Sequence, residues 1–333
     1  MDIDQRVKLF TKLGDWLDDL TESTLNEIQI HAKNQNNWFT FDNITLAING
    51  VRRYLRRDQL LQWISRYPIS QVKPKKVGIV MAGNIPLVGF HDLLCVLISG
   101  HSAMVKMSSQ DSYLMRWLID QMVKMDSDLK DQIIIVDKLN EADAVIATGS
   151  DNTARYFKYY FGKKPHIIRQ NRTSIAVLSG HESNDELSRL GSDIFAYFGL
   201  GCRNVSKVMV PRDYSFNLFF ESIQSFEKSI EHHKYLNNYD YNKSIYLVNK
   251  HPHLDNGFLL VTQSDQLVSP ISVLYYQEYE NTSKLEQYLT ENQDKIQCIV
   301  SNTNDHVKFG QAQNPHLWDY ADRVDTTAFL LSL

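Results

Sequence analysis

Cys202 has the sequence surroundings that best suit covalent chemistry. It lies in Gly-Leu-Gly-Cys-Arg-Asn, residues 199–204, between a predicted helix and a predicted strand. Glycine in such a turn lets a substrate approach the backbone closely, and the charge of Arg203 favours the thiolate, the nucleophilic form of cysteine. The alternative is a small buried residue in a tight turn. Cys95 and Cys298 lie inside apolar runs, so we expect both in the core.

Two further segments combine polar side chains with glycine. Residues 82–86, Ala-Gly-Asn-Ile-Pro, place the Asn84 amide after a predicted strand, where it could polarise a carbonyl oxygen or simply form a turn. Residues 147–150, Ala-Thr-Gly-Ser, end a strand and open a helix whose first N–H groups suit a phosphate. An ordinary helix cap by Ser150 or Asp151 explains the same pattern. The Gly-x-Gly-x-x-Gly motif of dinucleotide sites does not occur in the sequence.

The composition describes a folded chain without an extreme charge. Of 333 residues, 43% are hydrophobic and 22% are charged, which argues against disorder. The 35 basic and 39 acidic residues leave a net charge of −4, so we expect no nucleic-acid binding through a positive field. Scattered cysteines, and histidines without ligand spacing, predict neither a disulfide framework nor a metal site.

The chain carries no recognisable signal for export or membrane insertion. Residues 1–6 contain acidic side chains where a signal peptide has basic ones. The longest apolar stretch, residues 77–90, is shorter than the roughly 20 residues that span a bilayer. Sparse thiols favour a reducing compartment, so we predict a cytoplasmic protein without a membrane span.

Apolar periodicity predicts an N-terminal helical segment over residues 1–68, followed by α/β structure. Strand-like runs alternate with helical patterns, which is typical of a doubly wound parallel sheet. In such sheets ligands bind at the carboxyl ends of the strands, which is where we expect the loops 82–86, 106–111 and 148–153. Ser108 or Ser109 would cap the helix that follows the second loop. We predict strands at 77–81, 103–106, 132–136 and 144–148, and helices at 88–99, 113–125 and 151–161.

A second α/β unit follows the first. We predict its strands at 174–178, 205–210, 244–248, 258–261, 271–276 and 296–300. We predict its helices at 184–198, 216–236 and 283–292.

Taken in order, these segments resemble the aldehyde dehydrogenase superfamily and, within it, the fatty acyl-CoA reductases of the LuxC family. The matching pieces are 77–88 with Gly-Asn-Ile-Pro-Leu, 100–109 with Val-Lys-Met-Ser-Ser, 147–157 with Ala-Thr-Gly-Ser-Asp-Asn, and 199–210 with Gly-Leu-Gly-Cys-Arg-Asn. The resemblance implies an aldehyde-dehydrogenase-like α/β fold. It implies a Rossmann-type NAD(P)-binding domain at 69–173, to which the helices of 1–68 belong, a catalytic domain at 174–315 and a tail at 316–333.

The resemblance also implies a mechanism. Cys202 would attack an acyl-CoA thioester, CoA would leave, and a reduced nicotinamide cofactor would reduce the acyl group to an aldehyde. The Asn84 amide and the Cys202 backbone N–H would form the oxyanion hole. The implied cofactor contacts are Lys106, Ser108, Ser109, Gly149, Ser150 and Gln266.

Three departures from the oxidising aldehyde dehydrogenases bear on the reaction. Residues 169–173 read Arg-Gln-Asn-Arg-Thr where those enzymes have Glu-Leu-Gly-Gly-Lys, whose Glu activates water; hydrolysis should therefore be slow and reduction favoured. Ser109 stands where NAD-preferring relatives often have a Glu, which removes repulsion against a 2′-phosphate and favours NADPH over NADH. Gln266 corresponds to the Glu that holds the nicotinamide ribose and could still accept a hydrogen bond.

The resemblance predicts NADPH-dependent reduction of a long-chain acyl-CoA by a homo-oligomer, with an acyl-transferring partner enzyme. Two alternatives stay open. One is a short-chain CoA-acylating aldehyde dehydrogenase that runs the same steps in reverse. The other is a non-catalytic protein that binds acyl groups or nucleotides in a multienzyme complex.

Overall fold

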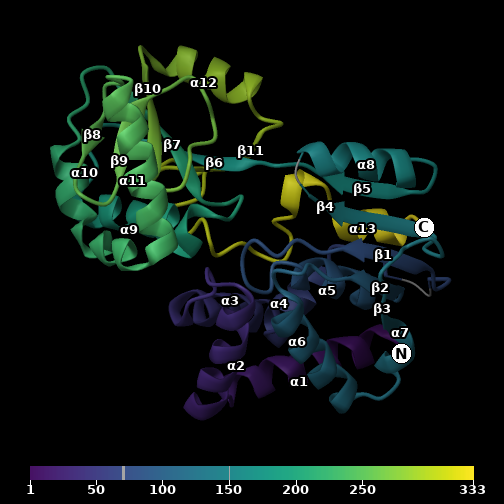
Figure 1. Cartoon of the computed structure of the whole chain (residues 1–333). Coiled ribbons are helices and arrows are strands. Elements are labelled where there is room, and N and C mark those ends of the chain that lie inside the picture. Colours follow the sequence, from purple (N-terminus) through teal and green to yellow (C-terminus); the bar gives the residue numbers. More distant parts are fainter. Residues whose placement is uncertain (70–71, 150) are drawn as a thin grey trace. The chain divides into compact units, whose positions relative to one another are not determined.

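The computed structural model describes residues 1–69, 72–149 and 151–333, which divide into two compact units. Unit 1 consists of Met1–Asn171 together with His316–Leu333, and unit 2 is Arg172–Pro315. Each unit is built around its own sheet of mainly parallel strands (Figure 1). In the described part of the chain, every helix is too short or too polar to cross a membrane.

Unit 1 begins with the helices α1 (Ile3–Asp18), α2 (Glu22–Gln35), α3 (Phe41–Tyr54) and α4 (Arg57–Ile64). This confirms the predicted helical start of the chain. Asp2, Thr21 and Thr40 cap the first three helices with side-chain oxygens, which satisfies N–H groups that a helix start leaves open. The apolar pattern that runs through residues 46–64 covers two helices, because the chain turns at Leu55.

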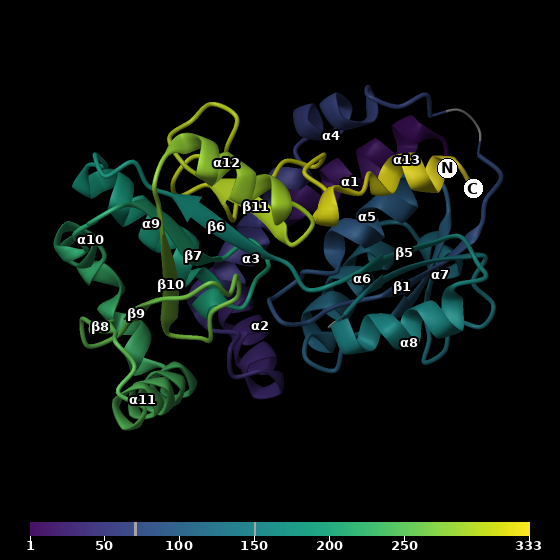
Figure 2. The same cartoon turned by 90° about the horizontal axis from the view of Figure 1, so that it is seen from above.

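The unit 1 sheet has the strand order β3-β2-β1-β4-β5, with every pair parallel. Its strands are β1 (Lys76–Val80), β2 (Ser102–Lys106), β3 (Ile133–Ile135), β4 (Ala144–Thr148) and β5 (His166–Arg169). Its helices are α5 (Phe90–Ile98), α6 (Ser112–Met125), α7 (Leu129–Gln132), α8 (Asp151–Phe161) and, from the C-terminal segment, α13 (Thr326–Leu331). Helix α8 covers one face, and α5 and α13 lie on the other (Figure 2).

The unit 2 sheet has the order β11-β6-β7-β10-β9-β8, in which β8 is antiparallel to its neighbour. Its strands are β6 (Thr173–Val177), β7 (Val205–Pro211), β8 (Leu254–Asp255), β9 (Leu260–Gln263), β10 (Val273–Tyr279) and β11 (Ile296–Val300). Its helices are α9 (Asn184–Phe195), α10 (Asn217–Ser222), α11 (His233–Val248) and α12 (Thr282–Glu291), with 3-10 turns at Ala196–Gly199 and Gln224–Glu231. A further 3-10 turn, Ala321–Arg323, lies in the C-terminal segment of unit 1.

Two predictions for unit 2 are wrong. The predicted strand 244–248 is the end of α11, because Tyr235, Tyr239 and Asn242 are buried at helical spacing while the apolar residue Val248 is 82% exposed. The predicted helix 216–236 is divided into α10, a 3-10 turn and the start of α11. Strand β5 was not predicted, because only Ile167 and Ile168 separate its polar ends.

Candidate active site

Cys202 lies in a turn immediately before β7, and its side chain is exposed. The chain enters this turn from the 3-10 segment at the end of α9, where Tyr197, Phe198 and Gly199 have φ values of 50°, 56° and 80°. This run of left-handed backbone is costly for the two aromatic residues. We call residues 201–204 the Cys202 turn; it is closed by the Asn204 N–H, which donates to the Gly201 carbonyl at 3.0 Å.

The Asn204 side chain holds the Cys202 turn against the end of α9. Its Oδ1 accepts the Gly201 N–H at 2.8 Å, and its Nδ2 lies 3.1, 3.3 and 2.8 Å from the carbonyl oxygens of Asp193, Ile194 and Ala196. Asn204 is buried, so these contacts replace the water that its amide gives up. The sequence analysis missed this role, although an Asn at the end of a glycine-flanked turn is a signal for it.

Ser174, on β6, fixes the other side of the turn. Its hydroxyl donates to the Cys202 carbonyl at 3.1 Å and lies 3.1 Å from the sulfur of Cys298. Cys298 on β11 and Cys95 in α5 are both buried, as predicted. Burial raises the pKa of the Cys95 thiol well above its usual value. Cys202 is the exposed thiol among the cysteines.

The Arg203 side chain bonds to the segment around residues 310–312 of unit 2. Its Nε donates to the Ala312 carbonyl at 2.5 Å. Asp193 accepts hydrogen bonds from the backbone N–H groups of Gly310 and Ala312 at 2.6 and 2.9 Å. The segment 310–312 is therefore bound by both Arg203 and Asp193. Burial raises the pKa of Asp193 to about 6, against the opposing effect of these hydrogen bonds and of Arg203. Part of the Arg203 charge is therefore shared with this carboxyl group.

Asn84 lies in a loop of unit 1 that follows β1, and it is exposed. We call residues 82–87 the Asn84 loop. A Cβ added at Gly83 would lie 2.4 Å from Ser108 Oγ and 3.1 Å from the Asp111 N, so glycine permits close packing against the loop after β2. Leu87, at the other end, has a φ of 57°.

Asp111 connects the two loops. Its Oδ2 accepts the Leu87 N–H at 2.7 Å. The side chain is 1% exposed, and Oδ1 has no hydrogen-bond partner among the described residues. Burial raises the pKa of Asp111 to about 8, with the Leu87 N–H acting in the opposite direction. Sequence reasoning missed this residue, because an Asp in a loop before a helix is ordinarily a cap.

The predicted cofactor residues of unit 1 follow the carboxyl ends of adjacent strands, as predicted. Lys106 ends β2 and is exposed, and Ser108 and Ser109 follow it, while Gly149 follows β4. Because β1 lies between β2 and β4, these residues and the Asn84 loop share one edge of the sheet. Ser150 lies outside the described residues.

The predicted cap of α6 is wrong. Ser108 Oγ accepts the Gln110 N–H at 3.2 Å, so this serine forms a local turn. The helix begins at Ser112, one residue before the predicted start, and Asp111 precedes it without a side-chain cap bond. Gln35 of α2 meets the first turn instead, since its Oε1 accepts the Tyr113 N–H at 2.9 Å.

Gln266 is exposed in the loop between β9 and β10 of unit 2. Ser206, near the start of β7, donates to the Leu267 carbonyl at 2.7 Å. The segment that holds Gln266 therefore lies beside the amino end of β7, the end that the Cys202 turn precedes. The hydroxyl groups of Ser206 and Thr173 also share a hydrogen bond, with 2.7 Å between their oxygens.

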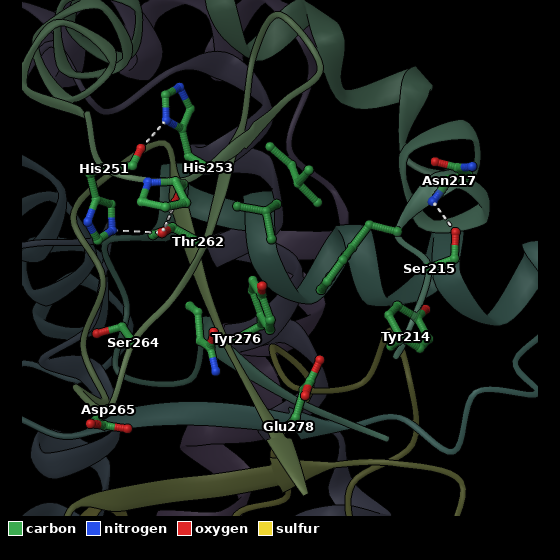
Figure 3. A pocket seen from close by; sticks show the side chains of 15 residues that line it. Tyr214, Ser215, Asn217, His251, His253, Thr262, Ser264, Asp265, Tyr276 and Glu278 are labelled. Atoms are coloured by element: carbon green, nitrogen blue, oxygen red, sulfur yellow. Dashed lines mark hydrogen bonds between the residues drawn. The ribbon is translucent and has the colours of Figure 1, made fainter. Parts of the chain in front are cut away.

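A separate cavity of about 680 Å³ lies in unit 2 (Figure 3). Tyr276 and Glu278 of β10 contribute to its wall, and the Tyr214 segment that follows β7 lines it as well. His251 lies 2.8 Å from Thr262 Oγ1 at one side. Its other lining residues come from the segment 251–254 and from the end of β9 with the residues that follow it. Cys202, which precedes β7, is not among the lining residues.

The stretch that the sequence resemblance matches to the water-activating Glu of oxidising aldehyde dehydrogenases begins with a buried arginine. Arg169, the last residue of β5, is 5% exposed and forms an ion pair with Asp92 of α5 at 2.5 Å. It also donates to Thr326 Oγ1 at 2.9 Å, which ties α13 to the sheet. Arg169 is thus part of the unit 1 core, and residues 169–173 contain no carboxylate.

Comparisons with known proteins identify a family and similar folds. Residues 25–218 match the family model described as acyl-CoA reductase (LuxC). No curated protein matches the chain.

The fold is similar to those of solved aldehyde dehydrogenases. The NAD⁺ complex of an aldehyde dehydrogenase from Bacillus cereus is 14% identical, with a TM-score of 0.63 over 92% of this chain and 73% of that one. The NAD⁺ complex of the Mycobacterium tuberculosis aldehyde dehydrogenase is 10% identical, with a TM-score of 0.64 over 94% and 76%. An NAD-dependent aldehyde dehydrogenase from Sinorhizobium meliloti is 11% identical, with a TM-score of 0.65 over 92% and 71%. At these identities the likeness concerns the fold.

Proposed function

Because the chain belongs to the LuxC family of acyl-CoA reductases, which are aldehyde-forming oxidoreductases, we propose that it reduces a long-chain acyl-CoA with NADPH through a thioester on Cys202. The observation that carries the proposal is the position of this thiol. Cys202 is exposed, whereas Cys95 and Cys298 are buried, and its turn is held by Asn204 and Ser174. A nucleophile needs both access and a fixed backbone.

In the first step, the Cys202 thiolate attacks the carbonyl carbon of the acyl-CoA. The carbon–sulfur bond to CoA then breaks, CoA leaves with the electron pair and takes up a proton, and the acyl group becomes a thioester on Cys202. The developing oxyanion would be stabilised by the side-chain amide of Asn84 and the backbone N–H of Cys202. The exposure of Asn84 supports this assignment.

The loops of unit 1 fit a nicotinamide cofactor. Lys106 is exposed at the end of β2, and a side chain at Gly149 would meet Thr153 and Phe157 at 3.0 Å, so glycine brings the backbone close to the start of α8. The residues that would hold the cofactor are Lys106, Ser108, Ser109, Gly149, Ser150 and Gln266. A serine rather than a carboxylate at position 109 favours a 2′-phosphate and hence NADPH.

When bound, a reduced nicotinamide supplies the hydride that converts the thioester to a thiohemiacetal. The oxyanion of this adduct collapses, the carbon–sulfur bond to Cys202 breaks, and the aldehyde leaves while the thiolate is restored. The competing reaction is hydrolysis of the thioester. Slow hydrolysis is supported by the composition of residues 169–173, which offer no carboxylate base to activate water. The first of them, Arg169, is buried in an ion pair with Asp92.

The test combines a cofactor assay with a mass measurement. Purified protein is incubated with NADPH and acyl-CoAs of increasing chain length, and its intact mass is measured after acyl-CoA alone. We expect NADPH oxidation, an acyl adduct, and loss of both in Cys202→Ala, with Cys95→Ala as the control because that thiol is buried.

Turnover that survives in Cys202→Ala would contradict the covalent mechanism. A preference for short acyl chains would favour the CoA-acylating aldehyde dehydrogenase. Absence of both NADPH oxidation and an acyl adduct would favour the non-catalytic binding protein.

A further inference from the structure

We infer that Asp111 is a positioning residue that holds the Asn84 loop while its carboxyl group is neutral, and that ionisation of this group loosens the loop. The inference rests on the proposed function only in assigning Asn84 to the oxyanion hole. The hydrogen bond, the burial and the backbone conformation that carry it are properties of unit 1 alone.

The hydrogen bond to Asp111 holds the one residue of the Asn84 loop that has a left-handed backbone, Leu87. Leu87 has a φ of 57°, a left-handed conformation that a side chain larger than glycine adopts at a cost. Its N–H donates to Asp111 Oδ2 at 2.7 Å, across a sequence separation of 24 residues. Loss of this acceptor would leave a buried N–H unpaired and let Leu87 relax toward an ordinary conformation. Asn84 would then lose its fixed position.

The surroundings of the second carboxyl oxygen of Asp111, Oδ1, make its ionised form costly. Oδ1 is buried and has no partner among the described residues, so an ionised Asp111 would place charge on an oxygen that nothing solvates. A neutral carboxyl group still offers Oδ2 to Leu87. Burial therefore costs the neutral form less than the ionised form, and it raises the pKa of Asp111 to about 8.

The groups on the neighbouring elements do not supply a compensating charge. The loop after β2 presents Ser108, whose carbonyl accepts the Asp111 N–H at 3.3 Å. From α2 come neutral Gln35, which bonds the start of α6, and the titratable His31, whose ring lies 5.1 Å from that of Tyr113. Glu27 acts on Tyr113 and not on Asp111. Above the pKa, the charge on Asp111 is best solvated when the side chain leaves its site, which breaks the bond to Leu87.

Two variants separate the charge from the hydrogen bond. Asp111→Asn keeps an acceptor for the Leu87 N–H and cannot ionise, whereas Asp111→Ala removes the acceptor. The first readout needs no substrate: hydrogen exchange of the backbone around Leu87 at pH 7 and pH 9, corrected for the intrinsic rate. We expect protection to fall at pH 9 in the original protein, to persist in Asp111→Asn, and to be low at both values in Asp111→Ala.

The second readout is the pH profile of kcat for acyl-CoA reduction. We expect kcat to decline above about pH 8 in the original protein, with a smaller change in KM, and this decline to disappear in Asp111→Asn. Asp111→Ala should lower kcat about tenfold or more at every pH, because a displaced donor no longer fits the transition state.

Exchange that is the same at both pH values in the original protein, or an alkaline decline of kcat that persists in Asp111→Asn, would overturn the inference. If the exchange pattern holds but no reduction occurs, the positioning of the loop stands and the proposed function fails.

Discussion

The Cys202 turn and the Asn84 loop are both held in place by a buried side chain, but the two side chains differ in chemistry. Both follow or precede a strand of a mainly parallel sheet, and left-handed non-glycine residues lie just before the turn, at Tyr197 and Phe198, and at the end of the loop, at Leu87. The turn is held by the neutral amide of Asn204, whose donors and acceptor all have partners. The loop is held by the carboxyl group of Asp111, which has one oxygen unpartnered among the described residues.

The difference teaches that a fixed backbone can be either independent of pH or conditional on it. An amide carries no charge and does not titrate, so the turn around Cys202 keeps this support across the working range of pH. The support that Asp111 gives the loop depends on pH, because burial makes the ionised carboxyl group costly to keep in its site. The raised pKa also makes stability depend on pH. The contribution of Asp111 to the free energy of unfolding is largest at low pH and falls as the pH rises from about 4 toward about 8.

The largest effect is expected from Asn204→Ala. It would leave the Gly201 N–H and carbonyl groups at the end of α9 without partners, which should lower the free energy of unfolding by about 2–4 kcal/mol. Urea denaturation measures this loss. Asn238→Ala is the matched control, since its amide makes a single bond to the Lys234 carbonyl within α11 and should cost under about 1 kcal/mol. Equal losses in the two variants would show that Asn204 does not hold the turn.

A smaller effect is expected from Gly83→Ala in the loop. The new Cβ would lie 2.4 Å from Ser108 Oγ, so the two loops must separate, at a cost of about 1–3 kcal/mol. Adding Ser108→Gly removes the nearer contacts and should recover part of the loss, because only the Asp111 N remains at 3.1 Å. Thermal denaturation of the single and double variants gives the coupling. If the two changes are additive, the loops are not packed against each other as described.

The smallest effect is expected from Ser109→Glu, which tests the choice of cofactor. Ser109 is exposed, so a carboxylate there would repel a 2′-phosphate through a largely solvated environment and should lower kcat/KM for NADPH about tenfold. The value for NADH should change little. Ser109→Gln has nearly the same size without the charge and is the control. A similar loss with Gln would mean that size rather than charge is responsible.

Much of the fold could be predicted because its strands are local and strongly apolar. The predicted strands at 144–148 and 296–300 have the observed bounds, and those at 77–81 and 103–106 differ by one residue at one or both ends. Predictions failed where local pattern and tertiary context disagree. The apolar run at 244–248 reads as a strand, yet it lies on the exposed side of a helix whose other side is buried.

The candidate site was predictable in its exposed residues and not in their supports. Cys202 and Asn84 stand in short segments rich in glycine or proline, which the sequence displays directly. Asp111 and Arg169 act through partners that are distant along the chain. No local pattern links Asp111 to Leu87, or Arg169 to Asp92 and Thr326 at separations of 77 and 157 residues.

The sequence by itself determined the α/β class, the order of the motifs and the LuxC family resemblance, because these depend on the apolar period and on short runs of residues. Only the tertiary structure decided how the Cys202 turn is held, that the Asp111 carboxyl group is buried against Leu87, and that the C-terminal segment completes unit 1. The physical reason is that exposure, desolvation and pairing belong to the packed chain. A side chain acquires them only when the fold brings distant residues against it.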